Sequence, residues 1–114
     1  MSTEFVTLLD TTSVTGSFSS EKRAGAGYHS QVNNVHTIVF ELNNLDGTVE
    51  IQGTLEIFPG EKDWVTLKNT ANSDIVYSGT NNGTFTATAR GNFIWIRAVG
   101  TINSGSITKI RFAI

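Results

Sequence analysis

Two histidines are the whole imidazole supply of this 114-residue sequence, and histidine is the side chain that most readily does acid–base or metal chemistry near neutral pH. His36 has the same parity as the apolar residues Ile38 and Phe40 and is expected at the end of a core face, whereas His29 lies in a glycine-rich stretch. Their spacing gives no support to a shared metal site. Cysteine is absent, so disulfides and thiolate ligands are excluded. We expect neither a metal nor another cofactor.

The carboxylates and serines also lack a catalytic pattern. The acidic residues are scattered over positions predicted to face outwards, which indicates no general acid–base pair. No serine lies in a G-x-S-x-G context. Neither Asp63 nor Asp74 lies among the dense oxygen ligands of a calcium site. Asn82-Gly83-Thr84 matches a glycosylation acceptor, but no signal peptide precedes it, so we interpret it as a turn. The sequence predicts a protein that is not an enzyme.

An aromatic and basic pattern in the C-terminal third is the most site-like feature of the sequence. Residues 93–99 alternate with a period of two, which is typical of a half-buried strand with one apolar face. The other face of this sheet is predicted to carry the candidate interface, formed by Phe93, Trp95, Arg97, Lys109 and Arg111. Three interpretations of this face stay open. The first is a solvated face on which the arginine side chains cover the aromatic rings, and the second is a face covered by a second sheet. The third is a contact with another subunit or protein, which the enrichment of Trp and Arg at binding hot spots favours.

Turn signals predict how the strands pair. Asp46-Gly47 lies between two alternating runs and is the strongest hairpin cue in the sequence. A two-residue loop there places Leu42 opposite Ile51, and it places Phe40 opposite Gly53, so that the ring covers a strand glycine.

Two further hairpins are predicted towards the C-terminal end. Gly91-Asn92 joins strands 84–90 and 94–99, and the three-residue loop 103–105 pairs Ala98 with Ile110. The second pairing brings Arg97 close to Arg111, which is tolerated if the guanidinium groups stack on Trp95 or Phe93, or if an acidic partner neutralises them.

The rest of the sequence supplies weaker strand signals. Strands are expected at Glu4–Leu9, Val14–Phe18, Asp63–Leu67 and Ile75–Tyr77, which brings the count to about eight. Trp64 is expected in the core or at its edge. The charged triplet at 21–23, followed by Ala-Gly-Ala-Gly, predicts an exposed loop or, alternatively, an arm that orders against a neighbouring subunit. We expect a single domain over 1–114, of which 1–35 is a partly loose N-terminal strand and arm.

Composition limits the class of protein. The sequence has 39% hydrophobic and 16% charged residues, with 11 glycines and 1 proline, which favours short strands joined by polar turns in a sandwich or barrel. A net charge of −2 argues against general nucleic-acid binding. No segment is long and apolar enough to span a membrane, and no signal peptide is recognisable. We therefore expect synthesis in a cytoplasm.

Two segments, 47–67 and 83–110, resemble a small β-sandwich module that recurs in bacteriophage virion proteins. In that module, G-T-V-x-V-x-G-S-x-D-G-x-x-W-x-x-L is followed by F-x-Y-I-R-A-x-V and by a final S-G-x-I/V strand. The matching positions are Gly47, Thr48, Val49, Ile51, Gly53, Trp64, Leu67, Phe93, Trp95, Ile96, Arg97, Ala98, Ser104, Gly105 and Ile107. The similarity covers about residues 38–112. The module's short S-x-D-G-x-x-W turn is replaced here by a longer stretch, 54–64, so a ligand role of that turn is not carried over.

The resemblance implies an antiparallel, jelly-roll-like β-sandwich that serves as a capsid decoration, neck or tail protein. Such a protein works in the virion, after synthesis in the host cytoplasm, by packing against copies of itself and other virion proteins. We expect no nucleic-acid or membrane partner, and we expect a homo-oligomer of cyclic symmetry. The alternative, from a different class, is a carbohydrate-binding module in which Trp95, Phe93 and Arg97 form a sugar-stacking platform.

Overall fold

The computed structural model describes residues 5–28 and 35–113, and these form an antiparallel all-β fold. The elements are β1 (Phe5–Thr12), β2 (Gly16–Ser19), β3 (Arg23–Ala24), β4 (Val35–Thr54), the 3-10 helix η1 (Glu61–Asp63), β5 (Val65–Thr66), β6 (Val76–Arg90) and β7 (Trp95–Ala113). The predicted fold class is confirmed. The number of strands is slightly smaller than expected because three of them are very long.

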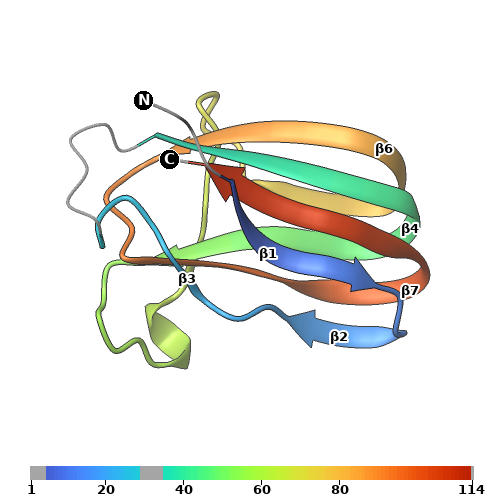
Figure 1. Ribbon diagram of the computed structural model, residues 1–114, viewed down its shortest axis with the longest axis horizontal. Coiled ribbons are helices and arrows are strands. Elements are labelled where there is room, and N and C mark those ends of the chain that lie inside the picture. The colour runs from blue at the N-terminus through green and yellow to red at the C-terminus, as the bar shows by residue number, and fades with distance from the viewer. Residues whose placement is uncertain (1–4, 29–34, 114) are drawn as a thin grey trace.

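The three long strands, β4, β6 and β7, bend in the middle and run through both layers of the fold (Figure 1). The first half of β4 pairs with the second halves of β6 and β7, and β1 adds to β7; we call this the first layer. The second half of β4 pairs with the first halves of β6 and β7, while β5 adds to β4 and both β2 and β3 add to β7; this is the second layer. One folded sheet therefore supplies both layers of a sandwich.

The bends of the three strands lie side by side and form a shared corner. In β4 the pairing with β7 is irregular between Asn43 and Asp46, and the pairing with β6 is irregular between Leu42 and Leu45. Asn44 has a φ of 47°, and Gly105 of β7 has a φ of 77°. Positive φ is the backbone conformation that glycine and asparagine tolerate best, so these residues allow the chain to turn from one layer to the next.

The predicted hairpin at Asp46-Gly47 is wrong, because β4 continues through it. Gly47 pairs with Gly79 and Ile102, and the expected partners Leu42 and Ile51 belong to different halves of the same strand. Glycine with positive φ suits a corner as well as a reversal. Here a continuous strand is favoured over a hairpin because β4 is paired on both sides along most of its length.

The two hairpins predicted further along the chain are also wrong. β6 and β7 are not neighbours, since β4 lies between them, and residues 91–94 connect the first layer to the second. The predicted loop at 103–105 is the corner of β7. Ala98 consequently pairs with Ile51, and Ile110 pairs with Phe40, in place of each other.

The core fills the space between the two layers. Its largest fully buried side chains are Phe40, Phe112, Ile38, Leu45, Ile51, Leu67, Ile96, Ile102, Ile107, Ile110, His36 and Val49. An aromatic ring does cover Gly53, as expected, but the ring is Phe93 and not Phe40: a Cβ at Gly53 would lie 2.8 Å from the Phe93 Cδ1 atom.

The segment after the charged triplet packs against its own chain, which corrects the expectation of an exposed loop there. Glu21, Lys22 and Arg23 are exposed, but Ala26 is fully buried. The Ala26 amide donates a hydrogen bond of 3.0 Å to Nε2 of His36. His36 therefore ends the core face as predicted and holds this segment. His29 lies outside the described residues.

Candidate functional site

The structure divides the predicted interface among three places. Trp95 and Arg97 lie in the first half of β7 and face outwards from the second layer, between the buried side chains of Ile96 and Ala98. Lys109 and Arg111 lie in the second half of β7, which belongs to the first layer. The five residues therefore do not form one face, because the bend of β7 separates them.

Phe93 also departs from the predicted face, since it precedes β7 and packs against the core cluster. Arg111, in the other layer, places its guanidinium carbon 4.8 Å from the ring centre of Phe5. Arginine stacking was expected, but Arg111 uses Phe5, and Arg97 and Arg111 are not neighbours.

Arg97 is held on the outer face of the second layer by a set of well-defined contacts. Its Nε donates a hydrogen bond of 2.8 Å to Oε1 of Gln52 on the neighbouring strand β4. Its guanidinium carbon lies 4.2 Å from the ring centre of Trp64, in the geometry of a cation–π contact. Glu61 adds an ion pair at 3.9 Å, but this carboxylate is 91% exposed and contributes little in water. The guanidinium group is therefore fixed in place, and its side chain is only 16% exposed.

Trp95 anchors the loop that follows β4. Its indole Nε1 donates a hydrogen bond of 2.9 Å to the backbone carbonyl of Ile57. The same ring contacts Lys22, whose Nζ lies 5.2 Å from the ring centre, and Tyr28, whose ring centre is 5.0 Å away. Trp95 thus connects the loop after β4 to the segment that contains Lys22 and Tyr28. A sugar-stacking platform would need an open ring face, and this ring is already engaged.

The loop that Trp95 holds exposes three large apolar side chains. Leu55 is 68% exposed, Ile57 is 59% exposed and Phe58 is 92% exposed. We call these three residues the apolar loop. The Glu56 amide donates a hydrogen bond of 3.1 Å to Oγ1 of Thr54, which adds a second anchor to the one at Ile57. Large apolar side chains that are held outwards together mark interaction surfaces in soluble proteins.

A hollow of about 440 Å³ opens between the apolar loop and the outer face of the second layer. Its lining residues are Ser20, Lys22, Ile57, Phe58, Pro59, Glu61, Trp64 and Arg97. Lys22 and Arg97 give its walls two cations against the single carboxylate of Glu61. The hollow and the apolar loop together form the candidate site, which suits a partner that inserts an apolar side chain beside an acidic or polar group.

The sequence indicated part of this site and missed the rest. Alternation correctly placed Trp95 and Arg97 on an outward face. The sequence does not predict the apolar loop, because residues 55–58 continue the alternating run that follows Asp46-Gly47. A signal was present: Leu55, Ile57 and Phe58 do not share one parity, so a strand could not bury all three on one face. Trp64 is half-buried at the edge of the site, and its ring contacts the guanidinium group of Arg97.

The described part of the chain contains no cluster of three or more His, Cys, Asp or Glu residues that could hold a metal ion. Among the same residues, no helix has the length and hydropathy needed to cross a membrane. The candidate site presents apolar surface, the fixed cation of Arg97 and the exposed cation of Lys22.

Comparison with solved structures finds a similar fold in the SPBc2 prophage-derived protein YomS. The TM-score is 0.64, and the match covers 98% of this chain and 92% of that chain at 9% sequence identity. At that identity the likeness shows a common fold. No family model matches the sequence, and no curated protein matches it.

Proposed function

We propose that this chain is a non-enzymatic structural protein of a bacteriophage particle, a capsid decoration, neck or tail component. It acts by packing against other virion proteins and copies of itself, and it resides in the virion after synthesis in the host cytoplasm. Two observations support the phage context: the resemblance of residues 38–112 to the virion module, and a fold like that of a prophage-derived protein.

We propose that the apolar loop is the surface through which the protein binds its partner. Phe58 is almost fully exposed, yet the loop around it is anchored by the hydrogen bonds from Trp95 and Glu56. An exposed aromatic residue on an anchored backbone loses less conformational entropy on binding than one on a mobile loop, which is typical of a binding hot spot. The fixed cation of Arg97 adds a directional contact beside it. Such a surface recognises another protein by shape and apolar contact.

The experiment is purification of the phage particles whose genome carries this sequence, followed by mass spectrometry of their proteins. We expect the chain in a fixed ratio to the major capsid or tail proteins. A particle assembled with Phe58→Ser should contain much less of the chain, because the hot spot is lost. Val14→Ser is the matched control: Val14 is also largely exposed, but it lies between β1 and β2 and should be incorporated normally.

Two results would contradict the proposal. One is absence of the chain from purified particles, and the other is normal incorporation of the Phe58→Ser protein. Specific binding of the purified chain to a glycan array, lost on Trp95→Ala, would favour the carbohydrate-binding alternative instead. That outcome is not expected, because Lys22 and Tyr28 already contact the Trp95 ring.

A further inference from the structure

We propose that the outer edge of β6 pairs with β6 of a second copy of this chain, antiparallel across a twofold axis. The first layers of the two copies then continue into one sheet. This inference names the surface through which copies meet, and it rests on the proposed function only for the expectation that copies assemble at all.

The edge of β6 is open over most of its length. Among the described residues, β6 pairs with β4 on one side, and its other side has a single isolated bridge, between Ala89 and Asn69. Main-chain groups along the rest of this edge therefore face away from the sheet. An open strand edge is a template for another strand.

The other edges of the sheet are short or irregular. β2, β3 and β5 have four, two and two residues, whereas β6 has 15. β1 is interrupted by a bulge between Thr7 and Leu9, and it carries the charge of Asp10. Short strands, bulges and charged side chains are the devices by which proteins prevent edge-to-edge pairing. From Val76 to Ala89 no residue of β6 is charged and none is proline, and in the first layer residues 83–90 of β6 pair with β4 without a bulge.

The charge pattern favours a second copy as the partner. A strand that pairs with itself brings each of its charges close to an identical charge, and like charges opposite each other are destabilising. The uncharged run of β6 avoids that repulsion. Its outward side chains in the first layer are Thr84, Thr86 and Thr88, and cross-strand pairs of threonine are favourable. A twofold axis near Thr86 places threonine opposite threonine.

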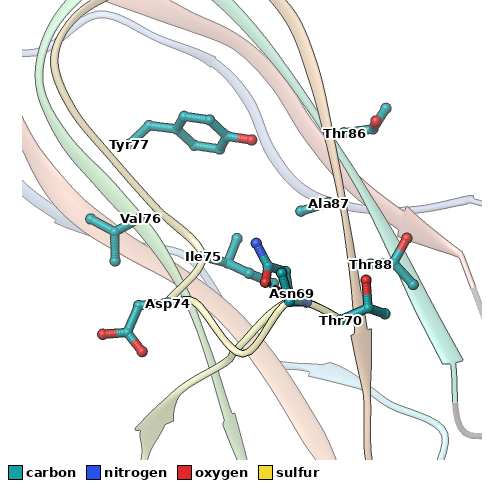
Figure 2. Close-up of a pocket in the computed structure, with 10 residues that line it drawn as sticks. Asn69, Thr70, Asp74, Ile75, Val76, Tyr77, Thr86, Ala87 and Thr88 are labelled. Carbon is teal, nitrogen blue, oxygen red and sulfur yellow. Dashed lines mark hydrogen bonds between the residues drawn. The ribbon is translucent and has the colours of Figure 1, made fainter.

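A gap between the layers lies directly beside this edge. It has a volume of about 380 Å³ and lies between the segment 69–77 and the end of β6 at Thr86, Ala87 and Thr88. Figure 2 shows Tyr77 reaching towards this part of β6 from one side of the gap and Thr86 pointing away from it. Tyr77 and Ala87 are only partly buried although both pack against the core. A second copy seated on the β6 edge would cover this gap.

The test is the mass of the purified chain in solution, measured by sedimentation equilibrium over a range of concentrations. We expect a dimer of twice 12.3 kDa. Thr86 is exposed on the edge strand, so Thr86→Lys and Thr86→Glu should leave the fold intact but place like charges close together across the axis. Each should raise the dimer dissociation constant by about tenfold or more. An equimolar mixture of the two should restore dimers, because the charges then attract.

Thr7→Lys is the matched control, since Thr7 is exposed on β1 at the opposite edge of the first layer. It should leave the dimer unchanged. Hydrogen exchange gives an independent measurement: the amides of 84–88 that point away from β4 should be protected at high protein concentration and lose protection on dilution.

A monomeric wild-type chain would overturn the inference. So would a dimer that Thr7→Lys weakens as much as Thr86→Lys, or a Lys and Glu mixture that stays monomeric. These failures are distinct from failure of the virion role. A chain that dimerises through β6 but is absent from particles contradicts only the proposed function. A chain that enters particles but stays monomeric in solution contradicts only the pairing.

Discussion

Gly105 is predicted to be a residue at which the corner of the fold is highly sensitive to substitution. Its φ is 77°, and a Cβ atom there would lie 1.9 Å from the backbone oxygen of Asn44. Positive φ costs a residue other than glycine about 1–2 kcal/mol. The clash with main chain requires the bends of β4 and β7 to move apart, and overpacking of this kind costs about 1–3 kcal/mol. Gly105→Ala should therefore lower the free energy of unfolding by about 2–5 kcal/mol.

Gly79→Ala separates the two contributions. Gly79 has a φ of 76°, almost the same as Gly105, but a Cβ atom there has nothing within 4 Å. Only the conformational cost of about 1–2 kcal/mol applies. The difference between the two variants then measures the steric requirement of the corner alone.

Urea unfolding followed by the fluorescence of Trp64 and Trp95 gives the free energies, with the m-value as a check that the same surface is exposed. We expect Gly105→Ala to be less stable than Gly79→Ala by about 1–3 kcal/mol. If the two variants differ by less than about 0.5 kcal/mol, which is the usual effect of a neutral surface substitution, close packing at the corner is refuted.

Three further predictions concern single side chains. Trp64→Ala should cost about 1–3 kcal/mol, because Trp64 is half-buried under Arg97; a loss above about 4 kcal/mol in urea unfolding would instead assign it to the core. His36→Phe keeps a buried ring but removes the acceptor of the Ala26 amide, so it should cost about 1–3 kcal/mol and speed exchange of that amide; unchanged exchange would contradict the role given to His36. Burial raises the pKa of Tyr77 above its usual value of 10.0. The unfolded chain therefore loses this proton at a lower pH than the folded chain. The contribution of protonated Tyr77 to the free energy of unfolding is complete below pH 10 and decreases as the pH rises through the raised pKa. Tyr77→Phe should remove that part of the fall, as measured by thermal unfolding at several pH values.

Alternation in the sequence predicted the strand segments well and their connections poorly. Six predicted strands proved to be the halves of β4, β6 and β7. The cause is physical: Gly47 and Gly105 supply positive φ at places where the side-chain alternation is interrupted, and both a hairpin and a corner require this. What decides between them is pairing with strands far away in the sequence. That pairing depends on all three bends being aligned, which no local pattern contains.

The candidate site was predictable to the extent that it depends on parity. Trp95 and Arg97 face outwards because their neighbours Ile96 and Ala98 are core residues. Lys109 and Arg111 were placed beside them only through the wrong hairpin, so the error in topology became an error in the site. The partner of Arg97 could not be predicted, because Trp64 comes from a different element and reaches it through the fold.

The shared corner also determines how the protein opens. In a sandwich of two separate sheets, one sheet can lose its hydrogen bonds while the other keeps them. Here β4 is central in both layers and continuous between them, so its amides should exchange with deuterium only when the whole molecule unfolds. The amides of Phe40 and Ile51, in different layers, should report the same opening free energy, equal to that of global unfolding. If either amide exchanged at a lower free energy than the other, the two layers would unfold as independent units. The continuous strand predicts a single cooperative unit.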